Sequence, residues 1–89
     1  MSYNYLNEKS YVLTDEGSAD VMKMKNFVDK AISEYGAVRC QEIMSKVKLN
    51  AGTSWEQLAC VDRLVELGEI EEVTKGMQVA GQYRIFTRY

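Results

Sequence analysis

Hydrophobic residues recur at helical spacing in three stretches of the chain. The first stretch runs from Val21 to Tyr35, where apolar side chains three and four positions apart predict a helix with one buried side. Gly36 follows it, and glycine readily adopts the left-handed conformation that ends helices. Ser18 or Asp20 is expected to cap the start of this helix.

Two shorter helices are predicted after the first, over residues 39–47 and 54–67. The segment Thr53-Ser54-Trp55-Glu56-Gln57 has the composition of a capping box, in which a hydroxyl residue is answered by Glu or Gln. One side of the 54–67 helix is apolar and consists of Leu58, Val61, Leu64 and Val65. The opposite side is predicted to be exposed and carries Glu56, Ala59, Arg63 and Glu66.

Two strands are predicted to close the chain. Residues 70–73 have strand composition, and Lys75-Gly76 is a hairpin turn signal. Apolar and polar residues then alternate over residues 79–89, in a register that turns Tyr83 and Ile85 toward the helices. The outward side of this strand is predicted to carry Arg84, Phe86 and Arg88.

The first 17 residues show no clear periodicity. We predict an N-terminal segment over residues 1–17, partly extended or disordered, ahead of a folded domain over residues 18–89. Within the segment, Tyr11-Val12-Leu13-Thr14 has strand composition, and Asp15-Glu16-Gly17-Ser18 has the composition of a turn. An alternative arrangement adds this segment to the C-terminal hairpin as a third strand.

The passage from the last helix to the strands has a characteristic order. Val61-Asp62-Arg63-Leu64-Val65-Glu66-Leu67-Gly68-Glu69-Ile70 leads from a helix through a glycine into a strand, after a short helix and turn at Gln41 to Asn50. With Gly81 to Tyr89 as the returning strand, this order resembles the winged helix-turn-helix superfamily over about residues 21–89. The resemblance implies a small α+β winged-helix domain of three helices followed by a two-stranded antiparallel wing, with a third N-terminal strand in the alternative arrangement.

Composition argues against several classes of function. With 89 residues, 46% of them hydrophobic and 27% charged, the chain fits one small globular domain. It has no histidine, only two cysteines and no phosphate-binding loop, so we expect no enzyme, no metal site and no cofactor. The sequence shows no signal peptide and no apolar run of membrane-spanning length, which predicts a cytoplasmic protein.

The resemblance implies that the start of the 54–67 helix reads the major groove of duplex DNA while the wing contacts phosphates. The implied function is a DNA-binding transcriptional regulator, acting as a homodimer through its N-terminal segment and first helix. Gln57 suits adenine, and Arg63 suits guanine or a phosphate. Lys46 and Lys48, at the end of the 39–47 helix, would join Lys75, Arg84 and Arg88 in a patch that binds phosphates. The implied DNA contacts are Thr53, Ser54, Gln57, Arg63, Lys75, Arg84 and Arg88.

The charge balance favours a different class of partner. Eleven basic and 13 acidic residues give a net charge of −2, so no overall positive field attracts nucleic acid. The alternative function is therefore a winged-helix protein-interaction module that binds no DNA and docks its partner through Trp55, Glu56 and Asp62. If Trp55 serves no partner, we expect it to pack beneath the N-terminal tyrosines Tyr3, Tyr5 and Tyr11.

The sequence also predicts the surroundings of two cysteines and one phenylalanine. Cys40 lies on an apolar side of its predicted helix and is expected in the core, whereas Cys60 is expected to be partly exposed. Phe86, on the outward side of its strand, would be free to stack on a nucleic-acid base. Packing within the sheet is the simpler interpretation of the aromatic residues at this end of the chain.

Overall fold

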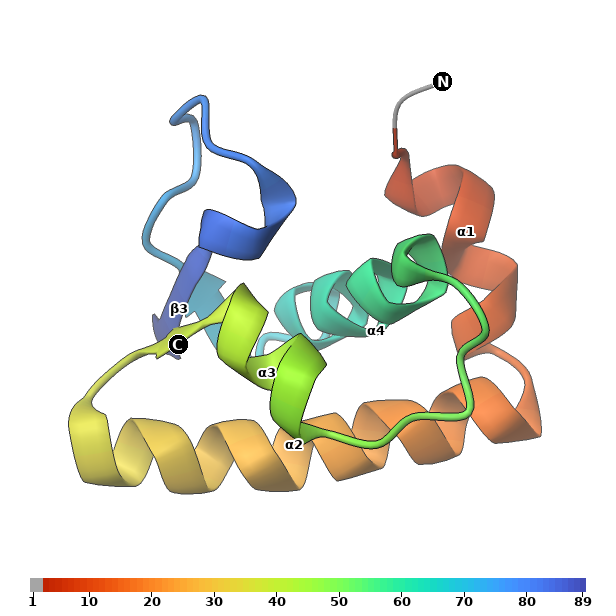
Figure 1. The fold of residues 1–89 in the computed structure, drawn as a ribbon, viewed down its shortest axis with the longest axis horizontal. Helices are drawn as coiled ribbons and strands as arrows, with labels where there is room; N and C mark the ends of the chain where they lie inside the picture. The colour runs from red at the N-terminus through yellow and green to blue at the C-terminus, as the bar shows by residue number, and fades with distance from the viewer. Residues whose placement is uncertain (1–2) are drawn as a thin grey trace.

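In the computed structural model, which describes residues 3–89, four α-helices pack with a small antiparallel sheet (Figure 1). The helices are α1 (Tyr5–Val12), α2 (Asp15–Tyr35), α3 (Cys40–Lys46) and α4 (Ser54–Glu66). The strands are β1 (Val38–Arg39), β2 (Ile70–Glu72) and β3 (Ile85–Arg88), and a short 3-10 helix, η1 (Gly81–Tyr83), precedes β3. Figure 1 shows α2 running along one side of the molecule beneath α3 and α4, with α1 beside α4.

β3 is the central strand of the sheet. It pairs antiparallel with β1, which places Val38 opposite Phe86, and with β2, which places Ile70 opposite Arg88. The presence and antiparallel pairing of the two predicted C-terminal strands are therefore confirmed. The second strand begins at Ile85 rather than at residue 79, and the predicted hairpin turn at Lys75-Gly76 lies within a longer connection. The third strand is β1, between α2 and α3, so the alternative in which the N-terminal segment supplies it is wrong. With two residues, β1 is too short to leave an alternating pattern in the sequence.

The prediction of a partly extended or disordered N-terminal segment is wrong for residues 5–12, which form α1. Asn4 caps this helix, and its side-chain oxygen accepts a hydrogen bond from the backbone N–H of Leu6 at 2.9 Å. Only Val12 of α1 is fully buried, so the helix lacks the apolar stripe on which recognition by periodicity depends. The prediction for Met1 and Ser2 lies outside the described residues.

α2 starts earlier than predicted, at Asp15, because Thr14 caps it. The Thr14 hydroxyl accepts a hydrogen bond from the backbone N–H of Gly17 at 3.0 Å. Ser18 and Asp20, the predicted caps, lie inside the helix instead. Residues 15–18, which have the composition of a turn, therefore form the first turn of α2.

Two glycines allow the ends of α2 to form. A Cβ atom at Gly17 would overlap the carbonyl oxygen of Tyr11, so only glycine permits the close approach of α1 and α2. Gly36 ends α2 with a φ of 82°, and its backbone N–H donates to the carbonyl oxygen of Ile32. The predicted end of this helix is confirmed.

α3 and α4 confirm the two shorter predicted helices to within one residue at each end. Thr53 caps α4 as expected, because its hydroxyl accepts a hydrogen bond from the backbone N–H of Glu56 at 3.1 Å. The Glu56 carboxylate in turn accepts a hydrogen bond from the backbone N–H of Gly52 at 3.0 Å, rather than from that of Thr53. The start of α4 is therefore held from both sides.

The core lies between the helices and the inner face of the sheet. Phe86 is fully buried there and Tyr83 is exposed, so the predicted register of the last strand is wrong. η1 takes up residues 81–83, and the alternation starts again at Ile85 with the opposite phase. Other large buried side chains are Met24, Val28, Ile43, Val61, Leu64 and Ile70.

Candidate docking site between α4 and the β2–β3 loop

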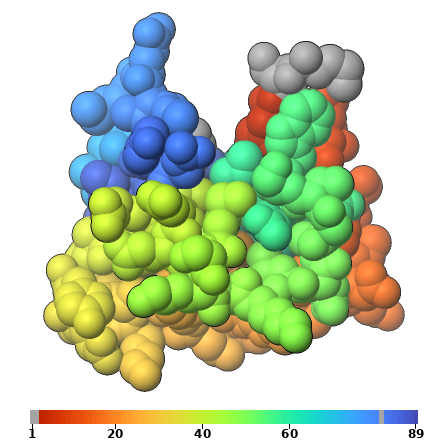
Figure 2. All heavy atoms as spheres, in the orientation of Figure 1, coloured from red at the N-terminus to blue at the C-terminus, as the bar shows by residue number. Residues whose placement is uncertain are grey.

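A groove separates α4 from the β2–β3 loop, which comprises residues 73–84. Figure 2 shows the surface hollowed between the blue lobe of this loop and the lobe that contains red α1 and the green start of α4. The cavity has a volume of about 430 Å³. We call it the loop groove, and its lining residues are Tyr3, Leu58, Asp62, Glu72, Met77, Val79 and Arg84.

Arg84 is the central polar residue of the loop groove. Its guanidinium donates hydrogen bonds to Asp62 Oδ1 at 2.7 Å and to Glu72 Oε1 at 2.8 Å. Only 15% of the Arg84 side chain is exposed. Its guanidinium carbon lies 5.0 Å from the centre of the Phe86 ring, which stabilises the cation further. Two carboxylates and one guanidinium leave this triad with one net negative charge.

The charges of the triad stabilise one another. Burial alone would lower the pKa of Arg84, but its hydrogen bonds to Glu72 and Asp62 outweigh burial and raise the pKa above its usual value. Burial alone would raise the pKa of Glu72, but hydrogen bonds from Arg84 and Thr74 hold it below its usual range. Arg84 therefore stays charged, with its donors already bound to two carboxylates.

Apolar side chains form the wall of the groove on the loop side. The exposed apolar residues of the loop are Val73, Met77, Val79 and Tyr83, and of these Met77 and Val79 line the groove. Lys75 is the one charged residue between positions 73 and 83. Leu58, partly buried on α4, also lines the groove. Exposed apolar side chains gathered around a groove are typical of interaction surfaces.

Polar side chains of α1 and of the preceding Tyr3 bind α4, in addition to the packing of the two helices. The Tyr3 hydroxyl donates to Asp62 Oδ2 at 2.5 Å, next to the Arg84 triad. The Tyr5 hydroxyl and the Lys9 ammonium both donate to Glu66, each at 2.8 Å. The first residues of the described chain thus form one border of the loop groove.

These contacts fix the protonation states of the groups involved. Burial and the hydrogen bond to Asp62 raise the pKa of Tyr3 above its usual value. Burial and the hydrogen bond to Glu66 raise the pKa of Tyr5 to about 12. Hydrogen bonds from Lys9, Tyr5 and Arg63 lower the pKa of Glu66 to about 2. At neutral pH the tyrosines are therefore donors and Glu66 is an acceptor.

The side of α4 predicted to be exposed is partly covered. Ala59 and Cys60 are both fully buried, and the predictions that they are exposed are wrong, because α1 packs against α4. Burial, together with the negative charges of Asp20 and Glu56, raises the pKa of Cys60 to about 12. Cys40 lies in the core as predicted, and burial raises its pKa to about 11. Neither thiol is placed to act as a nucleophile at neutral pH.

The predicted partner-binding residues differ in their surroundings. Asp62 lines the loop groove and is bound by Tyr3 and Arg84. Glu56 is engaged in the cap of α4. Trp55 is partly buried and lies outside the hydrophobic core cluster of the described residues. Asp62 is therefore the member of this set that belongs to the groove.

The three arginines predicted to contact DNA are engaged with other side chains. Arg63 pairs with Glu66 at 2.6 Å, and Arg84 is bound in its triad. Arg88 donates to the Ser33 hydroxyl of α2 at 3.0 Å. The remaining members of the predicted set are Thr53, Ser54 and Gln57 at the start of α4 and Lys75 on the β2–β3 loop.

Asp20 positions α4 from inside the core. Its fully buried carboxylate accepts hydrogen bonds from the Tyr11 hydroxyl at 2.5 Å and from the backbone N–H groups of Asn50 and Ala51 at 2.8 and 2.9 Å. The last two bonds fix the turn that leads into α4. The sequence contains a signal for this role, since Asp20 lies in line with the apolar side of α2.

Five residues of the loop groove are not among the predicted site residues, namely Tyr3, Leu58, Glu72, Met77 and Val79. Met77 and Val79 could have been found, because apolar side chains within a glycine-containing loop are an unusual use of exposed positions. Tyr3 and Glu72 reach the groove only through tertiary contacts with α4 and β3, for which the sequence has no local signal.

Comparison of the chain with family models, with curated proteins and with solved structures finds no match. Among residues 3–89, no helix is both long enough and apolar enough to cross a lipid bilayer. The same residues contain no group of three cysteine or carboxylate side chains arranged to hold a metal ion. Function therefore has to be inferred from the geometry of the site itself.

Proposed function

We propose that the chain is a winged-helix protein-interaction module that docks a partner protein in the loop groove. The element order α2, β1, α3, α4, β2, β3, with β3 central in the sheet, supports a winged-helix arrangement in which the β2–β3 loop is the wing. The apolar wall of the groove supports a protein as the partner.

The state of Arg84 carries this proposal. An arginine that contacts DNA phosphates needs free donors, whereas Arg84 is largely buried and bound to Asp62 and Glu72. A phosphate entering the groove would also meet one net negative charge. The groove is better suited to an apolar side chain packed against Met77 and Val79, with a neighbouring lysine or arginine directed at the carboxylates.

Peptide selection on the folded protein tests this proposal. A displayed library of random peptides would be panned against the immobilised chain, and the affinity of the selected peptides measured by fluorescence anisotropy. Met77→Asp should weaken binding at least tenfold, since it removes an apolar contact and would bury a carboxylate against the apolar side chain of the peptide. Met77 is 63% exposed, so the substitution should leave the fold intact.

Leu6→Asp is the matched control, because Leu6 is 75% exposed on α1 and does not line the groove. This variant should bind the selected peptides as the parent does. Selection that yields only peptides with equal affinity for both variants and the parent would place the docking site elsewhere.

Duplex DNA is the second candidate partner. Lys46, Lys48 and Lys75 are exposed and take part in no ion pair among the described residues. Lys46 lies at the end of α3 and Lys48 in the α3–α4 turn, while Lys75 lies on the proposed wing, where a winged helix would contact phosphates. These three lysines are the observation that favours DNA.

A titration against random duplex DNA at about 50 and about 200 mM salt separates the two candidates, because phosphate contacts weaken steeply with salt. The protein-interaction proposal predicts negligible binding at both concentrations. Tight binding that falls with salt, and that is lost in a Lys46→Gln/Lys48→Gln double variant, would instead support a DNA-binding regulator.

A further inference from the structure

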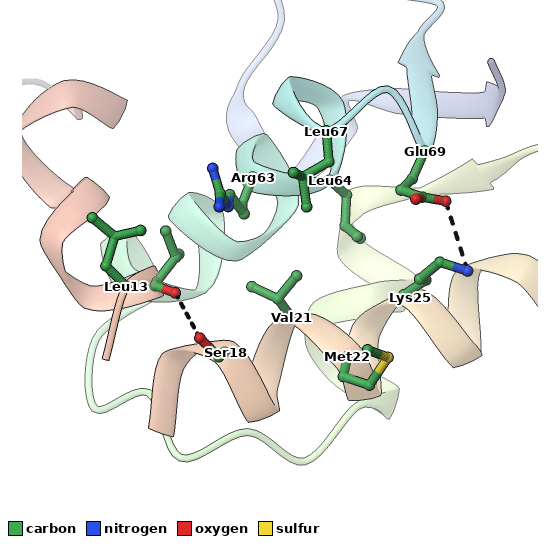
Figure 3. A pocket seen from close by; sticks show the side chains of 10 residues that line it. Leu13, Ser18, Val21, Met22, Lys25, Arg63, Leu64, Leu67 and Glu69 are labelled. Atoms are coloured by element: carbon green, nitrogen blue, oxygen red, sulfur yellow. Dashed lines mark hydrogen bonds and ion pairs between the residues drawn. The ribbon is translucent and has the colours of Figure 1, made fainter. Parts of the chain in front are cut away.

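A second groove lies away from the loop groove, where the end of α1, the first half of α2 and the end of α4 meet (Figure 3). Its volume is about 350 Å³. Leu13, Met22 and Leu67 line it and are 62%, 58% and 52% exposed, while Val21 and Leu64 connect it to the core. We call it the helix groove. Three large apolar side chains from three segments are thus gathered in one exposed place.

The charges beside this groove are paired and balanced. Lys25 binds Asp29 at 2.7 Å and Glu69 at 3.7 Å. Arg63 and Lys9 both bind Glu66, at 2.6 and 2.8 Å. Three cations and three carboxylates therefore leave no net charge. A strongly charged partner would find no complementary field here, whereas a copy of the same face would meet no repulsion.

We propose that the helix groove is the interface of a homodimer, in which a second copy of this chain packs against it across a two-fold axis. In such an interface the same patch meets itself, so Leu13, Met22 and Leu67 of both copies would form one apolar cluster. Met22 is suited to the centre, because its unbranched side chain adapts to an irregular cavity.

The size of the molecule is compatible with this pairing. A stable interface buries about 800 Å² per partner, which is about a seventh of the 5650 Å² accessible surface of this chain. The apolar centre is supplied by the three exposed side chains, and the mixed-sign ion pairs around them can form the polar rim. In the dimer, Leu13, Met22 and Leu67 would lose their contact with water, which is the driving force for association.

Sedimentation equilibrium between about 1 µM and about 1 mM protein tests the proposal, since this range spans weak and strong association. The parent chain should show a concentration-dependent approach to twice the monomer mass. Met22→Glu should raise the dimer dissociation constant at least tenfold, because each interface would then bury two unpaired carboxylates. Met77→Glu, on the other groove, is the matched control and should leave association unchanged.

A crosslinking variant tests the same interface without weakening it. Both native cysteines are buried, so in a Met22→Cys variant the introduced thiol is the accessible one, and mild oxidation should link two copies near the two-fold axis. Met77→Cys should form no rapid crosslink at the same concentration. A parent chain that remains monomeric up to about 1 mM would overturn the proposal, and so would a dimer that a folded Met22→Glu variant leaves intact.

Dimerisation and partner docking use different grooves and share no lining residue. Loss of peptide binding in Met77→Asp with an unchanged dimer, and loss of the dimer in Met22→Glu with unchanged peptide binding, are the two expected patterns. Either proposal can therefore fail without the other.

Discussion

Two charged centres, one fully buried and one only partly buried, hold this small fold together in different ways. Asp20 is satisfied by neutral donors, namely the Tyr11 hydroxyl and two backbone N–H groups. Arg84 is satisfied by the opposite charges of Asp62 and Glu72. Asp20 lies fully within the core, whereas Arg84 reaches the surface in the loop groove. Asp20 therefore only positions α4, whereas Arg84 and its carboxylates are accessible to a partner bound in the loop groove.

The largest expected effect comes from Asp20. Asp20→Ala leaves two partly buried backbone N–H groups and one partly buried hydroxyl without their acceptor, so the free energy of unfolding should fall by about 4 kcal/mol. Urea denaturation followed by circular dichroism measures this loss. Asp20→Asn retains one side-chain oxygen and should lose clearly less. A loss below about 1 kcal/mol for the alanine variant would mean that water reaches these groups, and the distinction between the two centres would then disappear.

Arg84 is expected to be the next most sensitive position. Arg84→Met keeps the contact with Phe86 but leaves Asp62 and Glu72 unpaired close to each other, which should cost about 3 kcal/mol at neutral pH. Adding Asp62→Asn and Glu72→Gln removes the repelling charges and should restore most of the stability. If the triple variant is no more stable than Arg84→Met, packing rather than charge is what Arg84 contributes.

A smaller effect is expected from acid at the contact between α1 and α4. Hydrogen bonds from Lys9, Tyr5 and Arg63 lower the pKa of Glu66 from 4.5 to about 2. The contribution of Glu66 is therefore complete above pH 4.5 and is lost as the pH falls toward about 2, where the folded protein takes up the proton. Hydrogen exchange should show protection of α1 decreasing over this interval before that of the core.

Glu66→Gln supplies the control for the acid effect, because it cannot titrate. Protection of α1 in this variant should be lower at neutral pH and should change little between pH 4.5 and about 2. An unchanged acid response would assign the effect to other carboxylates, such as those bound to Arg84.

Contacts between neighbouring residues are readable from the sequence, whereas contacts between distant residues are not. Helices α2, α3 and α4 and the pairing of β2 with β3 follow from local signals, such as the apolar spacing from Val21 to Tyr35 and the glycine at position 36. α1 was missed because its stabilising partners, Asp62 and Glu66, lie about sixty positions away in the chain. Local pattern contains no information about such contacts.

The candidate site was less predictable than the fold for the same reason. Asp62 was identified, but as a free carboxylate rather than as a partner of Tyr3 and Arg84. Phe86 was assigned to the wrong face because η1 interrupts the alternation, and a single skipped residue reverses every side chain that follows. The register of a short strand after an irregular loop depends on core packing rather than on its own sequence.

The central position of β3 has a consequence for synthesis of the chain. β1 and β2 both pair with β3, which follows them in the sequence, so neither has a partner until residues 85–88 have emerged from the ribosome. Until then the nascent helices lack the Phe86 side chain that occupies the centre of their core. Chains stalled before residue 85 should therefore stay protease-sensitive, and the fold should close in one late step.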